Sequence, residues 1–168
     1  VQGKLYKITP SLTDPVNKDG YNTKKRVILQ TNDGLTYGVK SDIFDSCGIT
    51  GKRSRRFADI GSGQKDNSQY EQVSPIFGCT GALALYKLEA LDQVMQNGEV
   101  WDNVFFSYKE DIDLGWRLLL VGWLNYFLPS CAAYHWRAAS GKEKSSDYQT
   151  ARNRNSKSSF INYLSYRN

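Results

Sequence analysis

Histidine is nearly absent from this sequence, with one residue, His135, among 168. A zinc site built from several imidazoles is therefore excluded, and a metal bound by His135 would need carboxylates as further ligands. The three cysteines, Cys47, Cys79 and Cys131, are odd in number and far apart, with no C-x-x-C spacing. This spacing argues against a zinc ribbon or a disulfide framework and fits a reducing compartment.

Longer patterns are also missing. There is no G-x-S-x-G motif, which argues against a Ser-His-Asp hydrolase. The aromatic K/R-G-F-G-F motif of RNA-binding sheets is absent too, and we expect no nucleic-acid partner. The sequence shows no signal peptide and no apolar run long enough to span a bilayer. We therefore expect a soluble, cytoplasmic chain, and contact with a membrane surface stays open.

Positive charge and aromatic residues are plentiful instead. The formal net charge is +5, and aromatic residues make up 13% of the chain. Basic residues gather in "GKRSRR" at 51–56 and in the segment 141–168, which we expect to form a basic helical tail. Such runs meet nucleic acid, acidic lipid headgroups or phosphorylated substrates, or only form a solvated surface. Residues 1–140 are expected to form one packed domain.

Hydrophobic spacing predicts an α/β chain. The expected strands are residues 4–8, 25–31, 35–39, 123–129 and 131–136, with a hairpin turn at "NDG" 32–34. Pro129 is expected to stop the fourth of these strands, and residues 47–72 are expected to form a loop. Helical spacing begins at Lys87 and closes at Asn97-Gly98, and a second helix runs through "KEDIDLGWRLLLVGW" to about Gly122.

Three acids, Glu110, Asp111 and Asp113, fall at the start of the second predicted helix. Acids at a helix N-terminus are favoured by the exposed N–H groups and the helix dipole alone. A second interpretation is a general base that takes the proton of an attacking hydroxyl. A third is a metal-binding D-x-D pair. It requires the helix to begin after the pair, because residues two apart in a helix point about 200° apart.

The order of three segments resembles one enzyme family. "FGCTGALALYKLEAL", then "WDNVFFSYKEDIDLGWRLLLVGW", then "FLPSCAAYHW" resembles the acceptor-side half of family-2 glycosyltransferases with the GT-A fold. The rhamnosyltransferase-like and galactofuranosyltransferase-like members are the most similar, and the resemblance covers roughly residues 42–136. It implies the C-terminal part of a Rossmann-like nucleotide-sugar transferase fold, with a mixed sheet flanked by helices.

The resemblance also implies roles for individual residues. Asp111 would be the general base, with Glu110 helping to bind or orient the acceptor. Asp113, from its place at the helix start, is expected only to cap the helix. His135 would complete the coordination of a divalent metal, Mn²⁺ or Mg²⁺, on the donor diphosphate. The residues expected to line the acceptor side are Thr80, Gly81, Trp101, Asp102 and Trp136. The implied reaction is an inverting transfer from a nucleotide-sugar donor to a glycan or lipid-linked acceptor.

In the family, the nucleotide-binding half with its acidic D-x-D motif precedes the segments quoted above. We therefore expect residues 1–140 to correspond to the acceptor-side half, with the donor-binding half lying before residue 1. The alternative from another functional class is a non-catalytic carbohydrate-binding or interaction module that keeps the acceptor surface.

Overall fold

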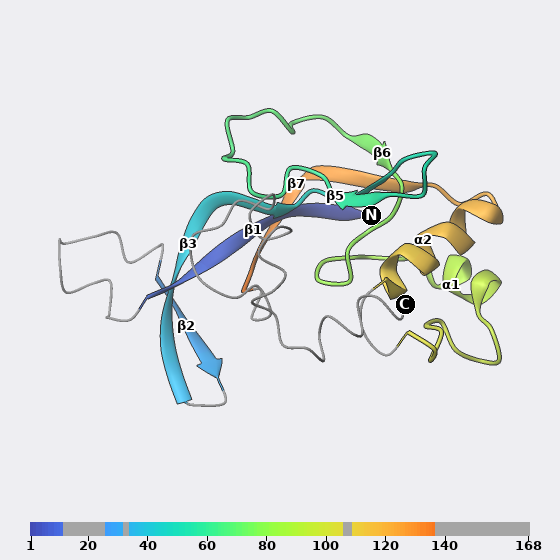
Figure 1. Cartoon of the computed structure of the whole chain (residues 1–168), viewed down its shortest axis with the longest axis horizontal. Helices are drawn as coiled ribbons and strands as arrows, with labels where there is room; N and C mark the ends of the chain where they lie inside the picture. The colour runs from blue at the N-terminus through green and yellow to red at the C-terminus, as the bar shows by residue number, and fades with distance from the viewer. Residues whose placement is uncertain (12–25, 32–33, 106–108, 137–168) are drawn as a thin grey trace.

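The computed structural model of the chain describes residues 1–11, 26–31, 34–105 and 109–136 (Figure 1). In chain order the elements are β1 (Gln2–Ser11), β2 (Arg26–Thr31), β3 (Gly34–Ser46), β4 (Ile49–Gly51), β5 (Phe57–Asp59), β6 (Ser74–Ile76), α1 (Leu88–Val94), α2 (Glu110–Leu120) and β7 (Asn125–His135). The predicted tail 141–168 lies outside the described residues, so the division at residue 140 stays a prediction.

The main sheet has five strands in the order β2-β3-β1-β7-β6, and β4 pairs with β5 in a separate two-stranded sheet. Strand β1 pairs antiparallel with β3 and parallel with β7, so the sheet is mixed. Figure 1 shows both helices at the end of the sheet opposite the β2–β3 hairpin. The predicted α/β class with a mixed sheet is thus confirmed. No helix among the described residues is long and apolar enough to cross a membrane.

The strands agree with the sequence prediction in position but differ in length. The predicted hairpin is present, with Thr31 opposite Gly34. The prediction of a plain loop over residues 47–72 is wrong, because β4 and β5 pair within it. Each of these strands has only three residues, too few for a period-two pattern to be visible in the sequence.

The prediction that Pro129 stops a strand is also wrong. Strand β7 runs through Pro129 without a break. Its register with β1 shifts there, since Gln2 pairs with Phe127 but Lys4 pairs with Ala132. An irregularity in pairing is where a sheet tolerates a residue without an N–H group. One continuous strand therefore replaces the two predicted ones.

Both predicted helices are confirmed. Helix α1 ends at Val94, and Asn97 and Gly98 form a separate left-handed turn closed by Gln96 and Glu99. Helix α2 ends at Leu120 in a Schellman motif, in which the N–H of Trp123 donates to the carbonyl of Leu118 at 2.9 Å. Gly122 supplies the left-handed residue, with φ of 90°.

Two buried clusters hold these elements together. Phe44, Cys47, Ile76, Cys79 and Phe127 form the first, and Ala90, Val94, Leu114 and Leu118 form the second, between the helices. Between the clusters, α2 packs on the segment after β6 through glycine. A Cβ on Gly115 would lie 3.2 Å from the Cα of Gly78 and 3.3 Å from the carbonyl oxygen of Phe77. Helix and segment therefore touch backbone to backbone, which places the first turn of α2 beside residues 78–81.

Candidate active site

The three acids lie in the first turn of α2, which begins at Glu110. Because the helix starts before the acids rather than after them, Asp111 and Asp113 point in different directions and do not form a D-x-D metal pair. The residue before the helix, Lys109, has φ of 71° and makes no side-chain capping bond. A left-handed lysine is an uncommon backbone state, and such states cluster at functional sites.

Asp113 has a structural partner instead of the predicted capping role. Its Oδ2 accepts from Arg117 Nε at 2.8 Å. The two other guanidinium nitrogens of Arg117 donate to the carbonyls of Val94 and Val100, at 2.6 and 2.7 Å. Arg117 thus ties the chain after α1 to α2, and this chain leads into Trp101.

Asp111 is the acid that faces the small-residue segment. Its Oδ1 accepts from the N–H of Ile112 at 2.9 Å, and the N–H of Gly81 also donates to the carboxylate. Burial raises the pKa of the Asp111 carboxyl, and the negative charge of Glu110 adds to this shift. The backbone donors act in the opposite direction but do not cancel it. A carboxylate with a raised pKa is a stronger base than an exposed one.

The segment 78–81 is hydrogen-bonded to β1. The N–H of Thr80 donates to Gln2 Oε1 at 2.6 Å, and Gln2 in turn donates to Ser46 on β3. Gly81, the next residue, is exposed, and a Cβ there would meet no atom within 4 Å. The space next to Asp111 is therefore open on the side of Gly81.

Three buried polar atoms around Asp111 have no hydrogen-bond partner among the described residues: Thr80 Oγ1, Tyr86 OH and Glu110 Oε2. Buried polar atoms in folded proteins almost always have partners, so each such atom needs an explanation. Burial raises the pKa of the Tyr86 hydroxyl above its usual range, with smaller contributions from Cys79 and Asp111. The Cys79 thiol is the nearest group to this hydroxyl, but the contact lacks full hydrogen-bond geometry. A ligand rich in hydroxyl groups would provide partners for all three atoms.

His135 lies apart from this group, at the end of β7. Its Nδ1 is 2.8 Å from Oδ2 of Asp45, a fully buried acid on β3. Metal-binding histidines commonly have one ring nitrogen held by a carboxylate in this way, leaving the other for the metal. His135 therefore fits the role of one ligand. The described part of the chain contains no group of three or more His, Cys, Asp or Glu residues that could hold a metal by itself.

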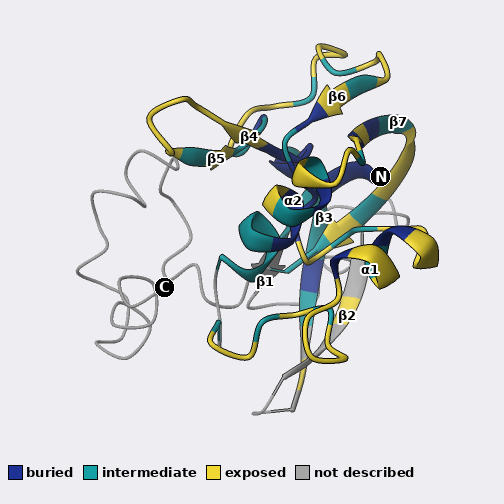
Figure 2. Ribbon diagram, turned by 90° about the vertical axis from the view of Figure 1, so that its right-hand side faces the viewer, coloured by how far each residue is buried: buried dark blue, intermediate teal, exposed yellow. Residues whose placement is uncertain are grey.

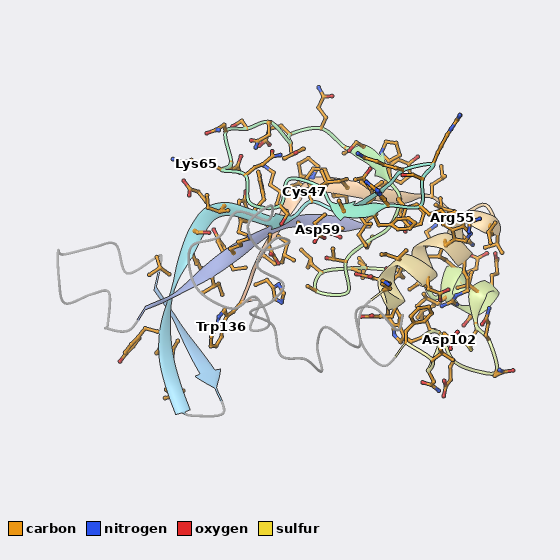
Figure 3. The ribbon with its side chains drawn as sticks, viewed as in Figure 1. Cys47, Arg55, Asp59, Lys65, Asp102 and Trp136 are labelled. Atoms are coloured by element: carbon orange, nitrogen blue, oxygen red, sulfur yellow. The ribbon has the colours of Figure 1, made fainter. Side chains whose placement is uncertain are left out.

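The predicted site residues thus fall into separate groups. Thr80, Gly81, Glu110 and Asp111 lie together at the start of α2. Trp101 is exposed and, with Asp102, belongs to the connection between the helices; Asp102 accepts from the N–H of Val104 at 2.9 Å. Trp136 follows His135, and Figure 3 shows Trp136 well away from Asp102. Their proposed roles on one acceptor surface stay predictions.

Three residues of the site escaped the sequence prediction: Gln2, Tyr86 and Asp45. Asp45 had a usable signal, because it directly follows the apolar pair Ile43-Phe44, and a buried charge requires a partner. Gln2 and Tyr86 carried no such signal, since their importance depends on contacts between residues distant in sequence. Only the fold brings them to residues 80 and 111.

Part of the chain is similar in sequence to a glycosyltransferase. The relatives are two proteins named N-acetylglucosaminyl-diphospho-decaprenol L-rhamnosyltransferase, from Mycobacterium tuberculosis strains CDC 1551 / Oshkosh and ATCC 25618 / H37Rv. Each is 38% identical over 66 residues, which is 39% of this chain and 20% of the relative. The match thus spans about one fifth of the length of these curated relatives. No family model matches the chain, and no solved structure matches it.

Proposed function

We propose that the described residues form the acceptor-side part of an inverting, family-2 glycosyltransferase of the GT-A fold. The observation that carries this proposal is the surroundings of Asp111. The carboxylate lies at a helix start beside an open glycine and three buried polar atoms without partners. The partial similarity to a rhamnosyltransferase supports the same class of reaction.

In the proposed reaction, an acceptor hydroxyl oxygen attacks the anomeric carbon of a nucleotide-sugar donor. The new glycosidic C–O bond forms as the bond from that carbon to the diphosphate breaks, and the configuration inverts. Asp111 takes the proton of the attacking hydroxyl, and the nucleoside diphosphate leaves with the electron pair. The N–H groups of Ile112 and Gly81 hold the carboxylate in position for this transfer.

Glu110, Thr80 and Tyr86 are proposed to bind the acceptor. Each has one buried polar atom that an acceptor hydroxyl could meet. His135 would hold a divalent metal through the nitrogen that Asp45 leaves free, together with ligands outside the described residues. A bound Mn²⁺ or Mg²⁺ would offset negative charge on the diphosphate. Since the relative's name includes a diphospho-decaprenol-linked sugar, we propose a lipid-linked acceptor for this chain as well.

The test compares Asp111→Asn with Asp92→Asn in the protein. Asp92 is an exposed acid on α1, so its replacement makes the same chemical change away from the site. Transfer is measured from a nucleotide-sugar donor to a short-chain N-acetylglucosaminyl-diphospho-lipid. We expect Asp111→Asn to lose about 10²–10⁴-fold in kcat, the usual contribution of a general base, and Asp92→Asn to match the wild type.

Donor affinity separates the base from a merely structural role. It is measured by titration calorimetry with nucleoside diphosphate and Mn²⁺, and we expect it to be the same in the wild type and Asp111→Asn. Full turnover in Asp111→Asn would overturn the base assignment. Glycan binding by the wild type with no transfer from any nucleotide sugar would favour the non-catalytic carbohydrate-binding module instead.

A further inference from the structure

A compact positive surface lies in the turn between β4 and β5. Lys52, Arg53, Arg55 and Arg56 are all exposed there. Among the described residues, no carboxylate forms an ion pair with any of the four. Four cations within five positions repel one another, so binding of an anionic surface would relieve this repulsion.

The turn has a defined shape that keeps these charges close together. The N–H of Lys52 donates to the carbonyl of Arg56 at 2.9 Å, and the N–H of Arg55 donates to the carbonyl of Lys52 at 2.8 Å. Arg55 takes the left-handed conformation, with φ of 58°. Two short strands close the turn, with Gly51 opposite Phe57. The charges are therefore concentrated at the tip of a hairpin.

Exposed apolar side chains lie next to the charged tip. Phe57 follows Arg56 directly, and its ring lies 4.7 Å from that of Phe77 and 6.3 Å from that of Trp116 on α2. Trp116 is 43% exposed, and Leu120, one helical turn further, is 73% exposed. Residues four apart on a helix share a face, so Trp116 and Leu120 form one apolar ridge.

The views agree that the tip and the ridge belong to one end of the molecule. Figure 2 shows the β4–β5 hairpin and α2 on the face turned to the viewer, with the exposed turn of the hairpin extending outward from the helix. Figure 3 places Arg55 at the end of the molecule that carries α2, far from Lys65. We define the docking surface as Lys52, Arg53, Arg55, Arg56, Trp116 and Leu120.

We propose that this docking surface binds the surface of an anionic lipid membrane. Anionic headgroups attract clustered Lys and Arg side chains, while Trp and Leu enter the boundary between headgroups and acyl chains. A soluble phosphate would use the cations but would leave the apolar ridge in water, so the combination favours a bilayer. The proposal stands independently of the proposed function, because none of the six residues belongs to the site around Asp111.

The test is co-sedimentation of the 168-residue chain with vesicles of phosphatidylglycerol mixed with phosphatidylcholine. The variant Arg53→Gln/Arg56→Gln is compared with the control Lys40→Gln/Lys65→Gln, which removes the same charge from β3 and from the loop that Lys65 occupies. Each membrane-facing cation contributes about fivefold in affinity, so we expect the first variant to bind roughly 30-fold more weakly. The control should stay within about threefold of the wild type, as surface charges remote from the membrane act only through the screened long-range field.

Trp116→Phe and Leu120→Ser test the apolar ridge. We expect a blue shift of tryptophan fluorescence on the anionic vesicles, and most of this shift should be lost in Trp116→Phe. Leu120→Ser should weaken binding severalfold without changing its dependence on salt. Circular dichroism spectra identical to that of the wild type confirm folding of each variant.

Four outcomes would overturn the proposal. Equal losses in the two charge variants would assign binding to net charge rather than to the docking surface. Equal binding to pure phosphatidylcholine would remove the anionic requirement. Displacement by millimolar inorganic diphosphate at constant ionic strength would assign the cations to a soluble ligand. Tighter binding to RNA that depends on Arg53 and Arg56 would assign them to nucleic acid.

Discussion

Asp66 and Asp111 are both partly buried aspartates near a tyrosine, yet their surroundings shift their pKa in opposite directions. The hydrogen bond from Tyr6 lowers the pKa of Asp66, with help from the N–H of Ser68 and from Lys4. Burial and the charge of Glu110 raise the pKa of Asp111. The same residue type is therefore stabilised as an anion in one region and destabilised in the other.

The region around Asp66 supplies all the partners that its carboxylate needs. Tyr6 OH donates to Asp66 Oδ2 at 2.5 Å, and Lys4 Nζ lies 3.7 Å from the same oxygen while also pairing with Glu71. The ring of Tyr6 stacks on Phe44, which belongs to the core of the sheet. These contacts pin the loop that contains Asp66 onto β1, which is a structural role.

The Asp111 carboxyl is more deeply buried than that of Asp66, and polar atoms around it lack partners. Thr80 Oγ1 and Glu110 Oε2 have no hydrogen-bond partner among the described residues, and Tyr86 OH has only a weak contact with the Cys79 thiol. Buried polar atoms without hydrogen-bond partners lower the stability of the fold around Asp111, whereas those around Asp66 have partners. The contrast teaches that deep burial combined with incomplete hydrogen bonding separates the candidate functional aspartate from the structural one.

The largest expected effect comes from moving Asp111 while leaving Asp66 in place. Gly115→Val puts carbon atoms against the backbone of Phe77 and Gly78, so α2 must shift. A displacement of about 1 Å at a catalytic group costs on the order of 100-fold in rate. We expect that loss in the transfer assay, with a smaller one for Gly115→Ala. Wild-type activity in Gly115→Val would show that Asp111 does not depend on this contact.

Asp66→Asn should lower the free energy of unfolding by about 1.5–3 kcal/mol at pH 7, the usual value of hydrogen bonds to a charged group. Because the folded pKa of Asp66 is lowered, its contribution is present above the unfolded value of about 3.9 and is lost as pH falls through the folded pKa. Urea unfolding of wild type and variant across this range measures the difference. A difference independent of pH would contradict the ionic origin.

Asp111→Asn should change stability in the opposite direction, raising the free energy of unfolding by about 0.5–2 kcal/mol at pH 7. The folded pKa of Asp111 is raised, so the folded state holds the proton more tightly than the unfolded state. The destabilisation therefore grows as pH rises from about 3.9 through the folded pKa, and is absent below that range. Urea unfolding at several pH values measures it. A loss of stability at pH 7 would mean that the carboxylate is satisfied in the fold.

The smallest expected effect on stability is that of Tyr86→Phe. Removing a hydroxyl whose contact with the Cys79 thiol is weak should change the free energy of unfolding by less than about 0.5 kcal/mol. Binding of the N-acetylglucosaminyl-diphospho-lipid analogue should weaken by about two- to tenfold, the value of one hydrogen bond. Saturation-transfer NMR measures this binding. The matched control, Tyr6→Phe, should do the reverse, losing stability and keeping acceptor binding.

The parts of the fold that the sequence predicts correctly are those that depend on residues close together in the chain. The hairpin at 32–34, both helices and Gly122 followed from turn chemistry and hydrophobic spacing, which act between neighbours in sequence. Strands β4 and β5 were missed because three residues carry no period. The predicted strand end at Pro129 is wrong because a proline interrupts a strand only where its position is regularly paired. The irregular register of β7 with β1 at this point appears only in the structure.

The candidate site divides in the same way. The sequence predicts Asp111 at a helix start, because a run of acids there precedes apolar residues at helical spacing. Its contact with Gly81 and the bond from Asp45 to His135 join residues 30 and 90 positions apart in sequence. No local pattern encodes such pairs. The ion pair of Asp113 with Arg117 has a helical i,i+4 spacing, so that pairing was available from the sequence, whereas the choice between capping and pairing was not.

Helix α2 carries Asp111 in its first turn and Trp116 and Leu120 in its second half. At 1.5 Å per residue, the carboxylate stands about 7.5 Å along the axis from Trp116 and about 13.5 Å from Leu120. A helix held by backbone contact does not stretch, so the distance along the axis between Asp111 and the proposed docking surface is fixed. Under the two proposals together, a lipid-linked acceptor sugar would have to meet Asp111 within about that distance of the headgroups that contact Trp116 and Leu120.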